Sequence, residues 1–450
     1  MGYFSKIFNL AKEKLNFLWG LRFTRDTLIL QVGSVVGTGL SIIASVIYAR
    51  ILGVTLYGDY ALIFALVSLV GLFMDWGASY AAITLLAAAY ARQDRQEIKD
   101  ILTYFFKLSS IIFFTVGLAA IIFCPLISQY LYHNPAIGKL ARIVLVGSSL
   151  QIFFSLLTTL LQVMRKMKYL IIAENVFQFF TILPSVVLVL LGYGLTGIVW
   201  GYLAAIFCSI IFSLLVYHKF SRRNNLVPSL LEIFRNFSRV KIARYFSFGF
   251  FMALDKNISS LFGLLPLMIL GYLATSGEVA NLKIALAYLT LPNILVSPIS
   301  RLLQVQLPKA KEAGVKDLKA NFYNSSVYSG LIFVFLMLGS LVLAPFLIST
   351  FYGSQFDLSI KLVYPLSLSV IFSGFAIGLG SLYRTIGKNI YSVIINIINI
   401  IIGLVLVFVA RKFTSPLVSV AILIIYWGTF ALGMHMMYIR NYFRKLKQEI

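Results

Sequence analysis

The residues best suited to do chemistry in this chain are charged side chains inside long apolar stretches. Asp255 and Lys256 are adjacent in one stretch, Lys283 and Arg301 lie in the next, and Asp75 lies in an earlier one. A charge in hydrocarbon is costly unless it faces protein or water. The three cations could therefore attract an anionic group, and the two carboxylates could hold a coupling proton or cation. The alternative is neutralisation, of Asp255 by Lys256 and of Asp75 by a lysine on a neighbouring helix.

Polar residues form rows along two such stretches. In the stretch 27–49 they recur every three or four residues: Gln31, Ser34, Thr38, Ser41 and Ser45, beside Gly33 and Gly37. In the stretch 281–306 one face carries the two cations with further polar residues and two prolines: Thr290, Pro292, Asn293, Ser297, Pro298 and Gln304. Helix packing explains the first row as well as a water-lined face does, whereas cations and prolines favour a water-lined face for the second. Arg50, which ends the first stretch, is either an interfacial anchor or a substrate contact. Glu174 follows Lys168 closely, which favours an ion pair at the membrane edge.

Residue patterns typical of enzymes are missing from the sequence. Its three histidines are far apart, Cys124 and Cys208 stand inside apolar stretches, and no glycine-rich loop with a lysine could cradle a phosphate. The connections between apolar stretches on one side are short, and no large extramembrane segment could hold a reaction. We therefore expect a protein that is not an enzyme, with no catalytic residue, metal site or cofactor.

The elements that carry these residues are long apolar helices. Of 450 residues 60% are hydrophobic and only 12% are charged, against roughly 25% charged in soluble domains. One bilayer crossing needs about 20 apolar residues. Twelve stretches fit: 27–49, 57–78, 101–127, 140–163, 169–191, 195–217, 246–271, 281–306, 323–349, 361–383, 390–410 and 416–439. The sequence predicts an all-α, polytopic membrane protein with twelve transmembrane helices.

The positions of the charged residues indicate that the net charge of +23 serves contact with the membrane and not with a nucleic acid. Alternate connections between the stretches carry 28 of the 38 Lys and Arg residues, and the opposite connections carry six. Basic connections stay in the cytoplasm, so we expect both termini there. Residues 1–26 are basic with apolar residues at helical spacing, which predicts an amphipathic helix on the membrane surface. Basic segments also follow at 218–245 and 440–450.

An internal repeat divides the chain. A shift of 222 residues lays the first stretch on the seventh and pairs Lys166 with Lys388 and Tyr169 with Tyr391. Because each repeat holds six crossings, both enter the membrane in the same sense, and an axis along the membrane normal relates them. We predict two parallel six-helix lobes, 27–217 and 246–439, joined by the linker 218–245. A path for a substrate is expected between the lobes.

Several short motifs resemble a known family. They are Tyr48-Ala49-Arg50-Ile51-Leu52-Gly53, Tyr57-Gly58-Asp59-Tyr60, Asp75-Trp76-Gly77, Arg92 with Asp94-Arg95-Gln96-Glu97, Tyr352-Gly353-Ser354-Gln355-Phe356 and Gly387-Lys388-Asn389. From about residue 22 onward the chain resembles the polysaccharide-biosynthesis flippases of the MOP superfamily, which are relatives of the multidrug and toxin extrusion (MATE) exporters. Where that family often has an acidic-basic pair, this chain has Pro266-Leu267, and Asp255-Lys256 lies eleven residues earlier.

The resemblance implies alternating-access transport of an undecaprenyl-diphosphate-linked oligosaccharide across the cytoplasmic (inner) membrane for cell-surface polysaccharide synthesis. Its expected partners are the lipid-linked sugar, membrane lipid, and the polymerase and glycosyltransferases of the same pathway. The substrate contacts would be Lys256, Arg301, Lys283 and Arg50, and the ion-coupling residues Asp75 and Asp255. The alternative is a cation-coupled multidrug exporter of the MATE type.

Overall fold

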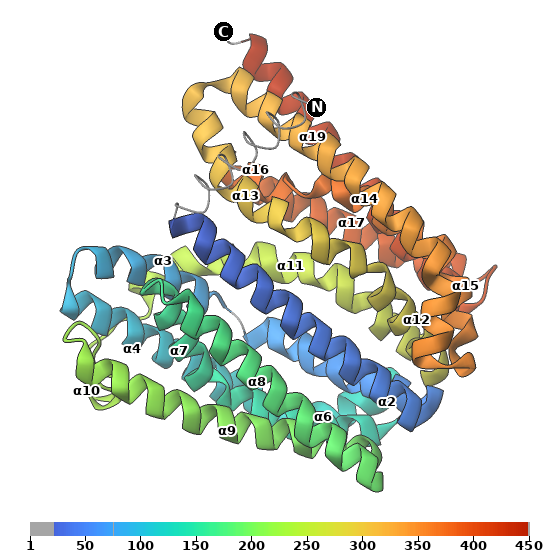
Figure 1. Ribbon diagram of the computed structural model, residues 1–450, viewed down its shortest axis with the longest axis horizontal. Helices are drawn as coiled ribbons and strands as arrows, with labels where there is room; N and C mark the ends of the chain where they lie inside the picture. Colours follow the sequence, from blue (N-terminus) through green and yellow to red (C-terminus); the bar gives the residue numbers. More distant parts are fainter. Residues whose placement is uncertain (1–21, 75, 449–450) are drawn as a thin grey trace, which may run out of the picture.

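The computed structural model describes residues 22–74 and 76–448, and all regular structure in these ranges is helical (Figure 1). Most of the predicted surface helix, residues 1–21, and the predicted coupling residue Asp75 therefore lie outside the described residues. The all-α prediction is confirmed for the ranges that the structure covers.

The first group of helices comprises α2 (Arg22–Met74), α3 (Ala78–Ala91), α4 (Arg95–Ile112), α5 (Leu118–Tyr132), α6 (Pro135–Leu150), α7 (Ile152–Val163), α8 (Met167–Leu188) and α9 (Gly194–Arg223). Short π-helical turns continue α4 into α5 at Phe113–Gly117 and follow α8 at Val189–Tyr193. α2 changes direction at Gly53, whose φ of 72° lies in the left-handed region that only glycine adopts without strain.

The second group follows a short helix, α10 (Leu230–Arg235). It comprises α11 (Ala243–Leu273), α12 (Ser276–Leu289), α13 (Leu291–Ala313), α14 (Val315–Tyr352), α15 (Asp357–Ile371), α16 (Leu379–Ile386), α17 (Asn389–Ala410), α18 (Pro416–Tyr426) and α19 (Leu432–Gln448). A 3-10 turn precedes α15 at Ser354–Phe356, another follows it at Phe372–Ala376, and a π-helical turn, Trp427–Ala431, joins α18 to α19.

Helices of this length and composition cross membranes. Within the described residues, nine helical segments are long and apolar enough to do so, or ten if the bent pair α6 and α7 counts as one crossing. Residues 29–74 count as one of the nine although 46 residues would reach roughly 69 Å, about twice the thickness of the hydrocarbon core. Side chains on α14 face outward, with Val342 80% and Phe335 77% exposed, as lipid contact requires. The protein is polytopic, and the count of twelve crossings stays a prediction.

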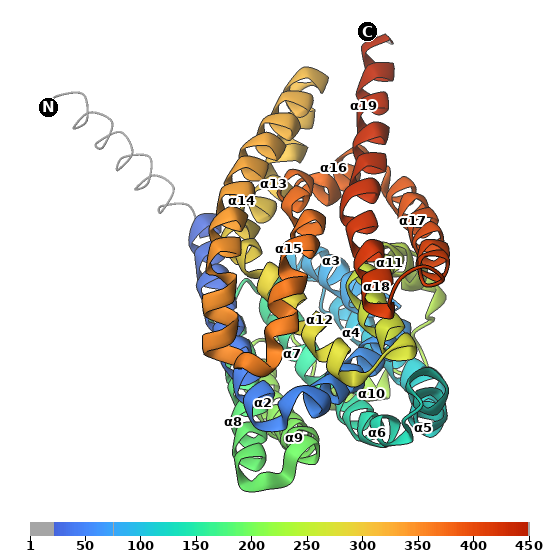
Figure 2. The same cartoon turned by 90° about the vertical axis from the view of Figure 1, so that its right-hand side faces the viewer.

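The two groups meet at one end of the molecule and diverge toward the other (Figure 1). The meeting end contains the turns at Gly53, at Ala274 between α11 and α12, and at Gly353 before α15. We call it the Gly53 end, and it faces the viewer in Figure 2. The opposite end, which contains α10 and the turns before α8 and α17, is called the linker end.

The linker between the groups is folded against α4. Ser229 caps α10 by accepting a hydrogen bond from the backbone of Glu232, whose carboxylate pairs with Arg95 at 3.1 Å. The Lys107 ammonium donates to the carbonyls of Phe237 at 2.8 Å and Val240 at 3.0 Å. This lysine, inside a predicted apolar stretch, therefore anchors the segment that leads into α11.

Several predicted stretches differ from the observed helices: 27–49 and most of 57–78 lie in the single helix α2, 140–163 divides into α6 and α7, and 361–383 divides into α15 and α16. The stretch that ends at residue 78 continues as α3 to Ala91, after a break at Gly77 with φ 83°. The stretch 281–306 divides at Thr290 into α12 and α13, because Pro292 has no N–H to continue the hydrogen bonding of α12.

Candidate functional site

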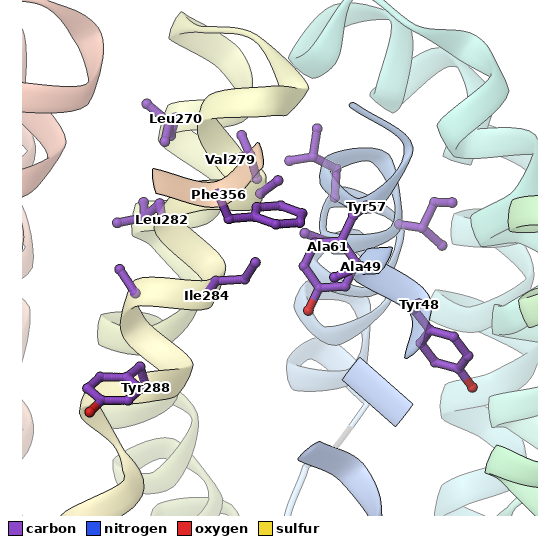
Figure 3. Packing of buried hydrophobic residues seen from close by; sticks show 14 of the residues in the cluster. Tyr48, Ala49, Tyr57, Ala61, Leu270, Val279, Leu282, Ile284, Tyr288 and Phe356 are labelled. Carbon is purple, nitrogen blue, oxygen red and sulfur yellow. The ribbon is translucent and has the colours of Figure 1, made fainter. Parts of the chain in front are cut away.

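Aromatic side chains from both groups interlock at the Gly53 end. Tyr57 of α2 is fully buried, and its ring centroid lies 6.0 Å from that of Phe356, which precedes α15 (Figure 3). The hydroxyls of Tyr57 and Ser45 are 2.6 Å apart, and Tyr352 of α14 lies 3.4 Å from the same serine. A tyrosine hydroxyl that leaves water needs a partner, and here Ser45 supplies one to tyrosines of both groups.

Arg50 also joins the two groups at this end. Its Nε donates to the carbonyl of Phe351 at 2.7 Å, and its Nη2 donates to the carbonyl of Thr350. Both acceptors are the last carbonyls of α14, where the helix dipole favours a cation. In return, the amide of Gln355 donates to the carbonyl of Ala49 at 3.4 Å. Arg50 therefore fastens the end of α14 to the bend of α2 in this conformation.

Lys283 is enclosed by tyrosines of the opposite group. Its ammonium lies 3.7 Å from the ring centroid of Tyr60 and 5.1 Å from that of Tyr57. At such distances the negative face of an aromatic ring attracts a cation. The start of α12, which carries Lys283, is fixed by a capping box between Thr275 and Glu278. The predicted anion contact therefore lies within the interface between the groups in this conformation.

The backbones of α2 and α12 touch at Gly58. A Cβ atom on Gly58 would lie 1.8 Å from the carbonyl oxygen of Ser276, closer than any real contact. Beside it, the Ser276 hydroxyl donates to Asp59 at 2.6 Å. Only glycine permits this approach, so the sequence at residue 58 allows the groups to close at this end.

The middle of the polar row in the first stretch, Ser34, Thr38 and Ser41, lines a pocket nearer the linker end. The pocket has a volume of about 410 Å³ between α2, α7 and α8, and its lining is Gly33, Ser34, Gly37, Thr38, Ser41, Phe154, Glu174, Asn175, Phe177 and Gln178. Gln178 of α8 donates to the Ser41 hydroxyl at 2.5 Å. Glu174 is predicted from the sequence to form an ion pair at the membrane edge and is not among the predicted site residues, yet it lines this pocket.

A buried polar chain occupies the second group. The Tyr383 hydroxyl lies 3.0 Å from Nδ1 of His435, whose Nε2 lies 3.1 Å from Oδ1 of Asn396. The amide of Asn396 donates to Ser259 of α11 at 3.3 Å. Four helices, α11, α16, α17 and α19, contribute to this chain. This chain is absent from the predicted site, although the histidine and the asparagine inside apolar stretches are signals for it.

Asp255 lies one turn before Ser259 on α11. It is half-buried, accepts a hydrogen bond from Ser392, and is close enough to Arg384 to interact with its charge. Its Oδ1 is buried and has no hydrogen-bond partner among the described residues. A carboxylate oxygen in that position can hold a proton or a cation. The same described residues contain no cluster of acidic, histidine or cysteine side chains that could bind a metal ion.

The 222-residue repeat relates the pocket to the polar chain. Gly33 corresponds to Asp255, Thr38 to Ser260, and Glu174 to Asn396. Two of these pairs are polar in both groups, whereas Gly33 has no side chain to match Asp255; the carboxylate therefore lies on α8 in the first group and on α11 in the second.

The remaining predicted site residues are dispersed. Lys256 is exposed on α11, 18 residues before the turn at Ala274, whereas Lys283 lies nine residues after it. At 1.5 Å per residue the two lie roughly 14 Å apart in depth. Arg301 belongs to α13, but its side chain and Asp75 are outside the described residues. The structure thus brings Arg50 and Lys283 to one interface and leaves Lys256 and Asp255 nearer the linker end.

Comparison with known proteins identifies the family of this chain. Residues 23–303, more than half of the chain, match the family described as "Polysaccharide biosynthesis protein". The chain belongs to this family. No curated protein matches this sequence.

Solved structures show that this polysaccharide biosynthesis protein has the MATE fold. An inward-facing multidrug resistance MATE family transporter of the MOP superfamily is similar with a TM-score of 0.77 and 17% identity, over 91% of this chain and 96% of that one. An outward-facing form described in the same words has a TM-score of 0.63 and 16% identity, over 96% and 98%. A MATE in the bent conformation is similar with a TM-score of 0.65 and 16% identity, over 96% of this chain and 98% of that one. The predicted resemblance to polysaccharide-biosynthesis proteins is confirmed by the family match, and these structures show the MATE fold.

Proposed function

We propose that this protein is a flippase that moves a lipid-linked oligosaccharide, of the undecaprenyl-diphosphate type, from the cytoplasmic to the outer leaflet by alternating access. The observation that carries the proposal is the family match over residues 23–303 in a chain with the MATE fold. Polysaccharide biosynthesis requires its lipid-linked intermediates to cross the membrane, and a two-lobe helical bundle is a known architecture for such a transfer.

Contacts at the Gly53 end support alternating access. Arg50, the Tyr57 cluster and the Gly58 approach all join the two lobes at that end, which the charge bias assigns to the outer side. The higher similarity to the inward-facing than to the outward-facing transporter agrees with a closed outer end. To release a substrate outward, the protein must break these contacts.

The cations then act in sequence. Lys256 and Arg301, on α11 and α13, attract the diphosphate while the linker end is open. Lys283 and Arg50 are engaged by the opposite lobe in this conformation, and they become available to the diphosphate when the Gly53 end opens. The pocket of Ser34, Thr38 and Glu174 hydrates the sugar. Charge-assisted hydrogen bonds hold phosphate about twice as strongly as neutral ones do.

A cation-coupled exporter is the second candidate. The structurally similar proteins are described as multidrug resistance transporters, and the unpartnered Oδ1 of Asp255 beside the Tyr383 and His435 chain could bind a coupling ion. Asp75 is the other coupling candidate. In this alternative the substrate would be a lipophilic cation. The lysine and arginine side chains proposed to contact the diphosphate would repel it.

The proposal places the protein in the cytoplasmic membrane with both termini inside. Its partners would be the lipid-linked sugar, surrounding lipid, and the glycosyltransferases and polymerase that precede and follow the transfer.

Reconstitution tests the proposal. Proteoliposomes containing the protein should move a fluorescent polyprenyl-diphosphate sugar between leaflets, measured by quenching from outside, and should not accumulate a cationic dye under a pH or sodium gradient. Dye transport without movement of the diphosphate lipid would establish the exporter instead. Protein-free vesicles provide the control for spontaneous transfer.

A further inference from the structure

Two pockets at the linker end are copies of one another. One, of about 590 Å³, lies where α7, α8 and α9 meet, and the other, of about 650 Å³, lies where α17 and α19 meet. The 222-residue shift pairs Lys166 with Lys388, Tyr169 with Tyr391, Val216 with Tyr438, Lys219 with Asn441, Phe220 with Tyr442, Arg223 with Lys445 and Asn224 with Leu446. Seven of the eight residues that line the second pocket therefore have counterparts in the lining of the first.

The backbone repeats the same turn at each pocket. Arg165 has φ 54° and its counterpart Gly387 has φ 69°, so a left-handed residue precedes the pocket lysine in both. The amide of Lys166 donates to Leu161 at 2.8 Å, and that of Lys388 donates to Tyr383 at 3.0 Å. A non-glycine residue such as Arg165 adopts this conformation at a cost, so the surrounding structure holds the turn in place.

Both pockets combine cations with aromatic rings. The first is lined by Lys166, Lys219 and Arg223, the second by Lys388, Arg444 and Lys445, and no acidic side chain among the described residues lines either. Lys166 lies 6.0 Å from the Tyr169 ring centroid and 5.9 Å from that of Phe220, and Lys388 lies 5.7 Å from that of Tyr391. Within 22–74 and 76–448, each pocket thus gathers positive charge with no carboxylate in its lining.

We propose that each pocket binds the phosphate headgroup of an anionic phospholipid. The pockets lie at the ends of membrane-spanning helices, on the side that the charge bias assigns to the cytoplasm, where headgroups are found. Basic pockets between helix ends on that side recognise anionic lipid headgroups, and tyrosines occupy the same depth in membrane proteins. One turn deeper, Ile172 and Ile394 are each 45% exposed, in position to contact acyl chains. This inference does not depend on the proposed flippase function.

The position of the pockets suggests what the lipids do. α8 and α17, whose first turns form the pockets, also carry Glu174 and Asn396 of the two polar sites. A headgroup bound at each would fix the start of these helices at the membrane surface while the lobes move. The repeat gives each lobe one such anchor.

Native mass spectrometry of the purified protein tests the proposal. With phosphatidylglycerol added, the wild type should retain two lipids, and with phosphatidylcholine almost none. Lys166→Gln with Arg223→Gln should remove one lipid, Lys388→Gln with Lys445→Gln the other, and all four together both. About thirty-fold weaker binding per pocket is expected from the loss of two cations near the membrane surface. Lysine-to-arginine variants at 166 and 388 should keep both lipids.

The matched control is Lys309→Gln with Lys316→Gln, which removes two exposed lysines at the same end without touching either pocket. It should retain both lipids, and all variants should elute as the wild type does on gel filtration. Unchanged lipid counts in the pocket variants, or equal loss in the control, would overturn the proposal. So would full displacement of phosphatidylglycerol by millimolar inorganic phosphate, which would mark a free-phosphate site, or by an equimolar polyprenyl diphosphate, which would mark a substrate site.

Discussion

Substituting Gly58 by alanine should prevent the two lobes from closing at the Gly53 end. The new Cβ would lie 1.8 Å from the Ser276 carbonyl oxygen, 2.4 Å from its carbon and 2.9 Å from the Cα. All three are backbone atoms, so no side-chain rotation can relieve the contact. A normal contact of about 3.5 Å requires α2 and α12 to separate by roughly 1.7 Å.

The free energy cost of this contact in the closed form sets the expected shift between conformations. Overpacking of a tight contact costs about 1–3 kcal/mol, and the conformation with an open Gly53 end avoids that cost entirely. The equilibrium should therefore move toward the open form by about 5-fold to 150-fold. Transport should fall, because the cycle needs both conformations.

Distance measurements between the lobes provide the assay. Spin labels at Lys139→Cys and Lys361→Cys, exposed on α6 and α15 near the Gly53 end, report the separation of the lobes when the exposed Cys208 is replaced by serine. Gly58→Ala should lengthen the dominant distance. Gly71→Ala is the control, since it lies on the same helix and its Cβ would meet no atom within 4 Å. If the distance distribution of Gly58→Ala matches those of the wild type and of Gly71→Ala, then closure of the lobes does not require glycine at residue 58, and the reasoning is refuted.

Three further predictions follow from the site and the topology. Single cysteines at Ser221 and Ser354 should react with an impermeant reagent from outside intact cells only at Ser354, and the reverse pattern would show that the orientation is inverted. Lys256→Ala and Arg301→Ala should each abolish transfer of a lipid diphosphate sugar in correctly inserted protein, while Lys256→Arg keeps more activity; full activity in both alanine variants would remove these residues from the path. In proteoliposomes with the pH gradient clamped, transfer should rise with an inside-negative potential, worth about 2.3 kcal/mol per charge per 100 mV, and Lys256→Glu should slow it. Transfer that follows only a proton or sodium gradient would contradict a potential-driven cycle.

The local sequence is sufficient to predict most of the helices, because the hydrocarbon core imposes a length and a composition on every crossing. It was insufficient at α3, where an alanine-rich segment continues the second stretch after Gly77. This segment is apolar as well, but the stretch 57–78 already has the length of one crossing, so the predicted helix ends there. The break within 281–306 was signalled by Pro292, but the sequence alone did not say whether the helix bends or divides.

The site residues were harder to place because their roles depend on distant parts of the chain. The sequence allows Arg50 to be either an anchor or a substrate contact, because its acceptors lie far along the chain, at Thr350 and Phe351. Lys283 was identified as an intramembrane cation, but nothing near it in sequence indicates Tyr57 and Tyr60 as its surroundings. A charge in an apolar stretch can thus be recognised locally, whereas its partner is set by how the lobes pack.

Under the proposed function, the repeat would let the two lobes bind different parts of one substrate. Their backbones place polar residues at equivalent depths, yet Gly33 and Ser34 of the first lobe correspond to Asp255 and Lys256 of the second. Charge in the second lobe suits a diphosphate and a coupling ion, while the hydroxyl and amide groups lining the first suit a sugar. In the proposed flippase, a substrate with an anionic head and a neutral glycan would therefore present its head to the second lobe and its glycan to the first. Closure at either end would then depend on the substrate as well as on the contacts between the lobes.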